Sequence, residues 1–518
     1  MKISGQDLIE AGWAEEADFT PMFAELKLLA ERGITEPKYA LKLLARKFPK
    51  DRHLIEMRNE PAPFSEAIEA ETEVDEENIG KVRRFMRDLM RCPVVEAGSI
   101  MPDACPAGNQ PATIPVGGAV AARRAILPGG HGHDICCSMF ATFFTCDRDT
   151  DAMMDHLVDS TRFGPGGRPR EDLVHHEVLD EPIWQNKFLA GLRDHAVMHM
   201  ADQGDGNHFG YIGKVEFSDE AFDRVDAAGH QQLLAPLRGK GEVFALVTHH
   251  GSRGLGSQLY RRGINAAIKQ TAKIAKGIPE AASWLSIDTP EGEAYWEALS
   301  YVGRWTKANH ESIHARFLER AEGTRLMDFG NEHNFVWRRG DLFLHGKGAT
   351  PAWTDEQGRP LLGLIPLNMA EPILIVLGRD NAEHLSFAPH GAGRNVSRRS
   401  FMKQFKRDDG NYDTAAMDQM LQRTTEGIDA RWYLGKPDLS ESPTGYKPAA
   451  QVRTQIEKFQ LADIVAEIQP LGSVMAGSAP KRGEEPLTPK QVRQIQHRAD
   501  RRKQRQHNRG GDWEEENM

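Results

Sequence analysis

The hydrophobic positions near the N-terminus repeat at the spacing of an α-helix. In FTPMFAELKLLAERG (residues 19–33), apolar residues return every three or four positions. We expect Thr20 to cap this helix, Pro21 to take its first position and Gly33 to stop it. The segment EPKYALKLLARKF repeats the pattern with basic residues in between. These segments predict a small helical unit within residues 1–55: a hairpin with a solvated basic face, or alternatively a docking or RNA-contacting module.

The pattern changes along the rest of the chain. The acidic stretch within residues 59–79 predicts a linker or an exposed helix. From there to residue 477, short apolar runs such as VFALVTHH and PILIVLG alternate with helical stretches. This alternation predicts an α+β core built on a mixed sheet. We therefore divide the chain into a helical unit with an acidic linker (1–80), a catalytic domain (84–477) and a tail (478–518).

The tail has almost no core-forming residues. Between Lys490 and Arg509 it carries eight Lys or Arg against one Asp. Such runs are typical of solvated or disordered tails. The alternative is a basic arm that follows a phosphate backbone, whose binding would depend on salt.

Composition narrows the class of protein. The net charge is -10, so contact with nucleic acid requires local basic patches. No apolar run approaches the length of a membrane-spanning helix, and the N-terminus lacks the layout of an export signal. Five cysteines are too few and too odd in number for a disulfide framework, so we expect a cytoplasmic protein without a membrane partner.

Four stretches concentrate side chains that bind metals: GGHGHDICCSM, GDGNHFG, VTHHGSRGLG and GNEHNFVWRRG. A single histidine of this kind is usually structural, but four such stretches together favour a metal centre. Imidazoles with one thiolate and one carboxylate suit Zn, Fe, Co or Mn better than Mg or Ca. The cysteine spacing of structural zinc sites is absent. We therefore expect a catalytic centre, with room for two ions that clamp a phosphoryl group.

The segment FAPHGAGRNVSRR (387–399) adds a nucleophile. A neutral His390 imidazole can attack phosphorus and form a covalent intermediate. Gly391 and Gly393 would expose backbone N–H groups to an anion, and Arg394 and Arg398 could clamp phosphate oxygens. In HHGSRG, Ser252 and Arg253 suggest a second phosphate contact. These residues together predict a metal-dependent phosphoryl or nucleotidyl transferase.

The stretches DICCSM, GNHF, HHGSRG, HNF and HGAGRNVSR, in this order, resemble the motifs of the RtcB family of RNA ligases. The resemblance covers about residues 85–477, and implies two manganese ions and GTP as cofactors. One ion would be held by Asp134, Cys137 and His208, and the second by Cys137, His249 and His333. Nucleotide binding would fall to Asn207, His390, Gly391, Ala392, Gly393 and Arg394, with His390 taking GMP as a phosphoramidate.

The resemblance also implies the reaction. RNA ends with a 3′-phosphate or 2′,3′-cyclic phosphate would be joined to 5′-hydroxyl ends, in RNA repair or tRNA splicing. The alternatives are a metal-dependent RNA 3′-end phosphodiesterase or nucleotidyl-capping enzyme that does not ligate, and a non-catalytic RNA-binding factor. Whether an activating protein is a further partner stays open.

Several positions depart from the family pattern. Cys136 stands in place of a glycine and His250 in place of a serine, both beside expected ligands. Tyr211 replaces an acidic residue, and Ala476 a lysine near the base. PLNMA (366–370) replaces Pro-Gly-Ser-Met-Gly, and PDAC (102–105) lacks the histidine of its motif. Because these changes gather around base recognition, transfer from His390 is a safer expectation than selection of guanine.

Overall fold

The computed structural model describes residues 3–13, 18–48, 54–106, 111–164 and 166–478. The chain divides into two compact units, one from residues 1–57 with 269–278 and one from 58–268 with 279–518. All but the first residue of the expected tail, 478–518, lies outside the described residues. Among the described residues, no helix combines the length and apolarity that a membrane span requires.

The smaller unit is helical, as the apolar spacing predicts. It contains α1 (Gly5–Glu10), α2 (Thr20–Glu31) and α3 (Pro37–Lys47). The expectation that Thr20 caps α2 is wrong: the helix already includes Thr20, and Phe19 precedes it without a side-chain cap. Pro21 is still tolerated in the first turn, where its missing N–H is not needed. Its hydrophobic cluster contains the buried residues Leu8, Trp13, Met22, Leu26, Leu29, Ala40 and Leu44.

The larger unit confirms the α+β fold with mixed sheets. Its main sheet has the order β13-β14-β17-β6-β7-β5-β9, all antiparallel, with β16 parallel to β17. The strands are β5 (Ser138–Thr145), β6 (Phe209–Val215), β7 (Val243–His250), β9 (Thr324–Glu332), β13 (Leu362–Ile365), β14 (Ile373–Gly378), β16 (Asp429–Trp432) and β17 (Ala462–Met475).

A second sheet has five strands in the order β1-β2-β3-β11-β10. They are β1 (Phe64–Glu66), β2 (Val95–Cys105), β3 (Val116–Arg123), β10 (Asn334–Arg339) and β11 (Leu342–Lys347). Two short ladders complete the strands, β4 (Ala125–Ile126) with β8 (Leu285–Ser286) and β12 (Ala349–Pro351) with β15 (Phe387–Pro389).

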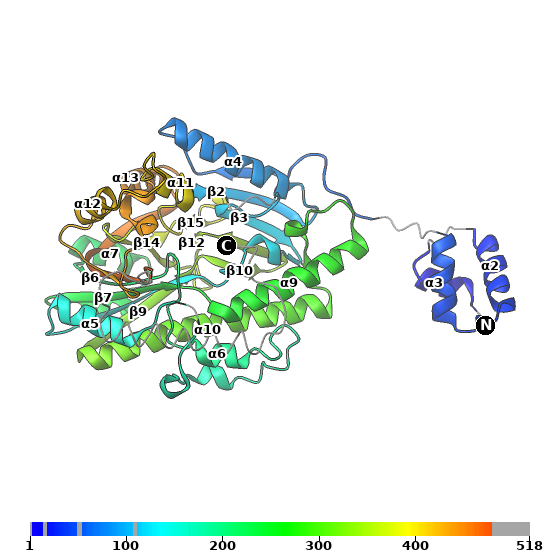
Figure 1. The fold of residues 1–518 in the computed structure, drawn as a ribbon, viewed down its shortest axis with the longest axis horizontal. Coiled ribbons are helices and arrows are strands. Elements are labelled where there is room, and N and C mark those ends of the chain that lie inside the picture. Colours follow the sequence, from blue (N-terminus) through cyan, green and yellow to red (C-terminus); the bar gives the residue numbers. More distant parts are fainter. Residues whose placement is uncertain (1–2, 14–17, 49–53, 107–110, 165, 479–518) are drawn as a thin grey trace. The chain divides into compact units, whose positions relative to one another are not determined.

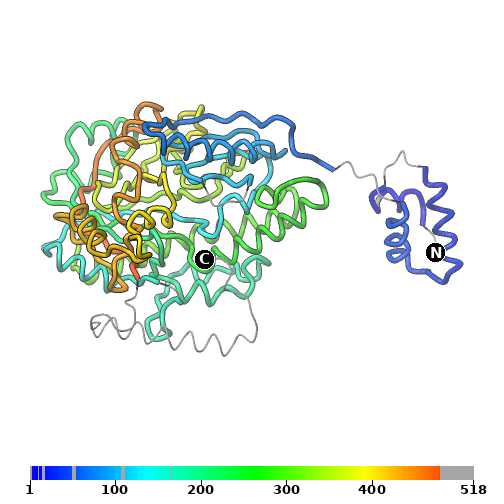
Figure 2. The backbone as a smooth tube through the Cα atoms, turned by 45° about the horizontal axis from the view of Figure 1, so that its top comes forward, coloured from blue at the N-terminus to red at the C-terminus, as the bar shows by residue number. Residues whose placement is uncertain are grey.

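Helices cover both sides of the strands. Both views place α4 and α10 on opposite sides of them (Figure 1 and Figure 2). Trp305, Tyr301 and Phe317 of α10 are fully buried, which anchors this long helix in the core. The helices are α4 (Glu73–Met90), α5 (Thr150–Ser160), α6 (Arg193–Met198), α7 (Asp219–Ala227), α8 (Gln231–Leu234), α9 (Arg253–Ile274), α10 (Pro290–Ala321), α11 (Arg398–Lys403), α12 (Thr414–Thr424) and α13 (Ala449–Lys458).

The acidic stretch within 59–79 is not a linker. It supplies β1, which pairs in parallel with β2, and the first turns of α4. Thr72 and Asp75 form a capping box at the start of α4, and the helix buries Ile79, Val82 and Met86. Most charged residues therefore occupy the exposed face of an amphipathic helix, whereas Asp75 is buried in its capping role. The boundary between the units lies after residue 57 rather than near 80, because β1 and α4 pack on β2.

Candidate active site

Four of the expected metal ligands lie at the same end of the main sheet, next to the ends of its strands. Cys137 and His208 immediately precede β5 and β6, whereas His249 is near the end of β7 and His333 follows β9. Because neighbouring strands run antiparallel, the starts of β5 and β6 lie beside the ends of β7 and β9. Four residues that are far apart in the sequence therefore meet.

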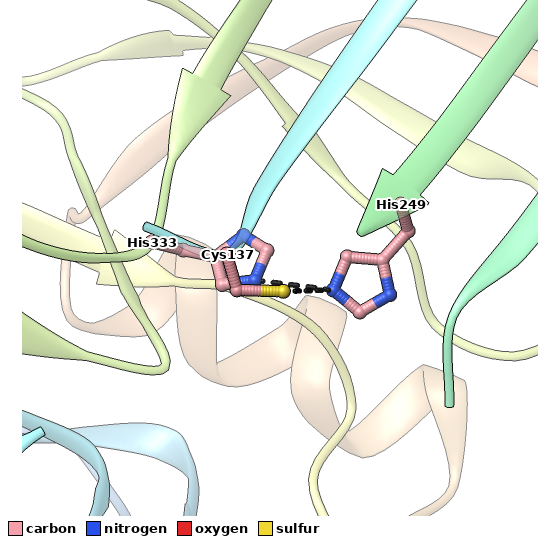
Figure 3. A group of neighbouring side chains, drawn as sticks. All are labelled: Cys137, His249 and His333. Atoms are coloured by element: carbon pink, nitrogen blue, oxygen red, sulfur yellow. Dashed lines mark hydrogen bonds between the residues drawn. The ribbon is translucent and has the colours of Figure 1, made fainter. Parts of the chain in front are cut away.

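The ligand atoms form two groups that share Cys137. One group is Cys137, His249 and His333, and the other is Asp134, Cys137 and His208; within each group all atoms lie within 4.8 Å. The Cys137 Sγ is 3.1 Å from the His249 Nε2 and 3.8 Å from the His208 Nε2. Figure 3 shows the thiol and the two imidazoles of the first group pointing toward one another. This arrangement matches the sharing of Cys137 that the resemblance implies.

Hydrogen bonds to backbone carbonyls fix which imidazole nitrogen faces the group. The Nδ1 of His208 is 2.9 Å from the Gln203 carbonyl oxygen, and that of His249 is 3.2 Å from the Asn207 carbonyl oxygen. A carbonyl oxygen only accepts, so each Nδ1 carries the proton and donates it. Each Nε2 therefore presents a lone pair to the ligand group, as metal-binding histidines do.

Burial sets the charge state of these side chains. It lowers the pKa of His249 to about 3, with the neighbouring His208 adding to the effect, and it holds the pKa of His333 well below its ordinary value. Burial and then the Asp134 carboxylate raise the pKa of the Cys137 thiol well above its ordinary value. His249 and His333 are thus neutral donors, and a bound cation would displace the thiol proton. Neutral imidazoles, a thiol and a carboxylate fit a transition-metal ion.

The two unusual neighbours of these ligands point elsewhere. Cys136 has a φ of 65°, a conformation that favours glycine, and its side chain joins a buried hydrophobic cluster that includes Tyr295. His250 faces the other side of β7, where its ring stacks on His310 with centroids 3.5 Å apart. Neither residue belongs to the two ligand groups, so both departures leave the expected ligand set intact.

His390 follows β15 and is held by a buried carboxylate. Its Nδ1 is 2.5 Å from the Oδ2 of Asp103, which also accepts from the His390 backbone N–H. The Asp103 side chain is completely buried, and its Oδ1 has no hydrogen-bond partner among the described residues. The Nδ1 therefore carries a proton, and the Nε2 is left with a free lone pair. The His390 ring lies 4.9 Å from that of His333, centroid to centroid.

A pocket of about 900 Å³ contains His390 and, from the ligand groups, His249. Gly393 must be glycine here, since its φ is 68° and a Cβ would lie 1.9 Å from the Asp103 carbonyl oxygen. Every residue that the sequence assigned to nucleotide binding lines this pocket: Asn207, His390, Gly391, Ala392, Gly393 and Arg394. His249 is part of the same wall.

The two arginines of the loop are paired with one carboxylate. Arg394 Nη2 donates to Glu441 at 3.1 Å and stacks over the Tyr446 ring at 4.3 Å. Arg398 Nε lies 2.6 Å from the other Glu441 oxygen, and the Glu441 side chain is fully buried. Glu441 therefore fixes the loop and offsets part of its charge. Arg394 Nη1 is buried without a partner among the described residues and remains available to an anion.

The second expected phosphate contact is not at this pocket. The Ser252 hydroxyl donates to the Ile135 carbonyl oxygen at 2.5 Å, and the nearest carboxylate to Arg253 is that of Asp202. Neither Ser252 nor Arg253 lines the pocket that contains His390. These two residues support the loops around the ligand groups instead.

One end of the pocket is apolar. Tyr211 is buried there, and its hydroxyl donates to the Ile468 carbonyl oxygen at 2.8 Å. The segment 366–369 and Met475 line the same pocket, and Ala476, next to Met475 in sequence, is buried. The family motif has a carboxylate at the position of Tyr211. The Tyr211 hydroxyl does not take the place of that carboxylate, because it already donates its hydrogen bond to the backbone.

Three ionisable residues at or near this pocket were not predicted from the sequence. They are Asp103, Glu441 and Lys347. Burial lowers the pKa of Lys347 to about 8, and the next residue, Gly348, has its Cβ position 2.9 Å from the His390 ring. A lysine between two glycines in HGKGAT was the available signal. Asp103 was visible in PDAC, but nothing local connects it to a histidine almost 300 residues later.

Comparison with known proteins identifies the family of the chain. A family model described as tRNA-splicing ligase RtcB matches residues 171–476, and the chain therefore belongs to the RtcB family. Asp134 and Cys137 precede the matched residues, yet the structure brings them to the ligands within it.

The relatives are distant. The chain is 25% identical to the tRNA-splicing ligase RtcB of Thermococcus kodakarensis over 444 residues, 72% of this chain and 86% of that protein. It is 28% identical to the tRNA-splicing ligase RtcB of Pyrococcus horikoshii, over 52% of this chain and 32% of that protein. Identity to the RNA-splicing ligase RtcB of Escherichia coli is 21%, over 57% of this chain and 74% of that protein.

Proposed function

We propose that this protein is an RNA ligase that joins 3′-phosphate or 2′,3′-cyclic phosphate ends to 5′-hydroxyl ends, with GTP as the activating nucleotide. Membership of the RtcB family supports RNA ligation. The observation that carries the proposed chemistry is the free Nε2 of His390, fixed by Asp103 in the pocket that His249 also lines. A non-catalytic binding protein has no need for such a nucleophile.

The first step would form a covalent bond to His390. Its Nε2 lone pair attacks the α-phosphorus of GTP, the bond to the β-phosphate oxygen breaks, and pyrophosphate leaves with the electron pair. The imidazole gains positive charge as the N–P bond forms. The Asp103 carboxylate offsets this charge and keeps the Nδ1 proton in place.

The next steps would use the RNA ends. Water opens a cyclic phosphate to a 3′-phosphate, whose oxygen takes GMP from His390 and restores the free imidazole. The 5′-hydroxyl oxygen then attacks the 3′-phosphorus, loses its proton, and displaces GMP. In this sequence of steps, His390 is the one residue that forms and breaks a covalent bond to the nucleotide.

The donor set fits two manganese ions. Asp134, Cys137 and His208 would hold one ion, and Cys137, His249 and His333 the other. Ions held there would act as Lewis acids and would neutralise charge on phosphate oxygens. The side chains contribute neutral lone pairs and one thiol whose proton must leave.

The test is to incubate the protein and manganese with each of four α-labelled nucleoside triphosphates, then with two RNA strands of the stated ends. The expected result is an acid-labile label from GTP and a joined RNA product. A 3′-capped RNA that never joins would favour the capping alternative. That alternative is motivated by the part of the pocket lined by Tyr211, which departs from the family motif. Absence of any protein label would overturn the mechanism.

Replacing Asp103 by asparagine tests its role as a positioning residue. We expect the labelling rate to fall by roughly 10² to 10⁴-fold, because the amide fixes the imidazole less well and carries no charge. The KM for the nucleotide should change only a few-fold, because Asp103 binds the histidine and not the nucleotide. Asp219→Asn, at an exposed position of α7, is the control. Equal loss in kcat and rise in KM would instead indicate general damage to the pocket.

A further inference from the structure

An exposed basic surface begins where the pocket ends. Val396, Ser397, Arg398 and Ser400 line the pocket of His390. Beyond them, four exposed side chains form what we call the α11 basic patch: Arg399, Lys403, Lys406 and Arg407. Arg399, Lys403 and Lys406 follow at intervals of four and three residues, and the first two share one face of α11.

The charges of this patch are not used by the fold. None of its four members forms an ion pair with any described residue, which is also true of the exposed Arg87 and Arg170, whereas Arg124 and Arg304 are paired with carboxylates. Toward the described residues, the patch side chains form one hydrogen bond, which Arg407 donates to the Tyr412 carbonyl oxygen. Like charges held side by side repel one another, so their retention next to the pocket favours an anionic partner.

Buried aromatic packing anchors the helix that carries the patch, and an exposed aromatic side chain lies nearby. Phe401 is buried and packs edge-on against Phe405, with ring centroids 5.7 Å apart, which anchors the opposite side of the helix. An antiparallel bridge joins Lys406 to Tyr412, whose side chain is 44% exposed. Clustered cations beside an exposed aromatic ring are the combination that binds a single-stranded nucleic acid, through phosphates and stacked bases.

We propose that the α11 basic patch and Tyr412 bind the single-stranded RNA segment that ends in the reacting 3′-phosphate. This inference rests on the proposed function, because it requires that a 3′-end be delivered to His390. The strand would cross the patch and pass Arg398 before its terminal phosphate reaches the pocket. The net charge of -10 makes such a local surface necessary, since the global field repels RNA.

The test compares two triple variants with equal changes of charge. The patch variant carries Arg399→Glu, Lys403→Glu and Lys406→Glu. The control carries Arg87→Glu, Arg170→Glu and Lys240→Glu, at exposed positions that do not line the pocket. Affinity for a short fluorescein-labelled RNA ending in a 3′-phosphate is measured by anisotropy over a range of salt concentrations. Labelling of His390 without RNA is measured in parallel.

In the patch variant we expect the slope of log affinity against log salt to fall by about 2, since each lost phosphate contact on a single strand removes about 0.7. The control should keep the wild-type slope, and both should label His390 within about twofold of wild type. Tyr412→Ala should lower RNA affinity roughly 5- to 100-fold, whereas Tyr412→Phe keeps it. The single-site variants also serve if the triple variant does not fold.

The outcomes separate this inference from the proposed function. Normal labelling with equal RNA affinity in the patch and control variants would overturn the patch and leave the ligase mechanism standing. It would also point to an acidic protein as the partner of these side chains. Loss of RNA affinity only in the patch variant, in a protein that never labels His390, would support the patch and overturn the nucleotide chemistry.

Discussion

Replacing His390 by alanine is expected to abolish both the nucleotide label on the protein and RNA joining, by roughly 10⁴-fold or more. No other described side chain presents a free imidazole lone pair that a buried carboxylate fixes in this pocket. Removing the ring therefore removes the group that would bond to phosphorus. The measurement is retention of an α-labelled nucleotide on the denatured protein, followed by the yield of joined RNA.

The matched control for this variant is His175→Ala. The His175 side chain is 72% exposed and does not line the pocket, so its loss should change neither readout. RNA joining from a pre-activated 3′-guanylylated strand should survive in His390→Ala, because that step no longer needs the histidine. A stable label in His390→Ala would show that another residue is the nucleophile and would contradict the mechanism.

Replacing Cys137 by serine is expected to have the second largest effect, because this residue belongs to both ligand groups. A serine hydroxyl does not ionise at neutral pH and is a poor ligand for a transition metal. We expect the manganese content after dialysis to fall from about two ions to fewer than one, and labelling to fall by roughly 10³-fold. Elemental analysis of the dialysed protein measures the first, and the nucleotide label the second.

The neighbouring residue supplies a closely matched control. Cys136 is also a buried thiol, but its side chain lies in a hydrophobic cluster outside both ligand groups. Its φ of 65° suits glycine, so Cys136→Gly should fold and keep both ions. If Cys137→Ser retained both ions while Cys136→Gly lost one, the assignment of the bridging thiol would be reversed.

Much of this site could be predicted from the sequence because its chemistry sits in compact motifs. Glycines beside His208 and His390 marked places where backbone approaches a ligand, and the structure brings these residues into one region. The departures at Cys136 and His250 could not be judged from the sequence. Their consequence depends on a backbone dihedral angle and on the side of a strand that each residue faces, which only the fold determines.

The remaining gaps arise from contacts between distant residues. Asp103 meets His390, and Glu441 meets both Arg394 and Arg398, across intervals that no local pattern encodes. The acidic stretch that includes the first turns of α4 was predicted to be a linker or an exposed helix, because its charge density hides the buried face of the helix. The helix α2 begins at Thr20, one residue earlier than predicted, so Thr20 is not its N-cap. A difference of one residue is usual at a helix boundary.

The assembly of ligands from opposite strand ends has a consequence for how the newly made chain matures. His333 follows Cys137 by 196 residues, so at ordinary rates of protein synthesis the thiol leaves the ribosome roughly 10 to 40 s before its last partner exists. Until β9 is added beside β5, the complete ligand set does not exist. Under the proposed function, a complete metal site would therefore form only late in the synthesis of each molecule, because Cys137 would wait for His333.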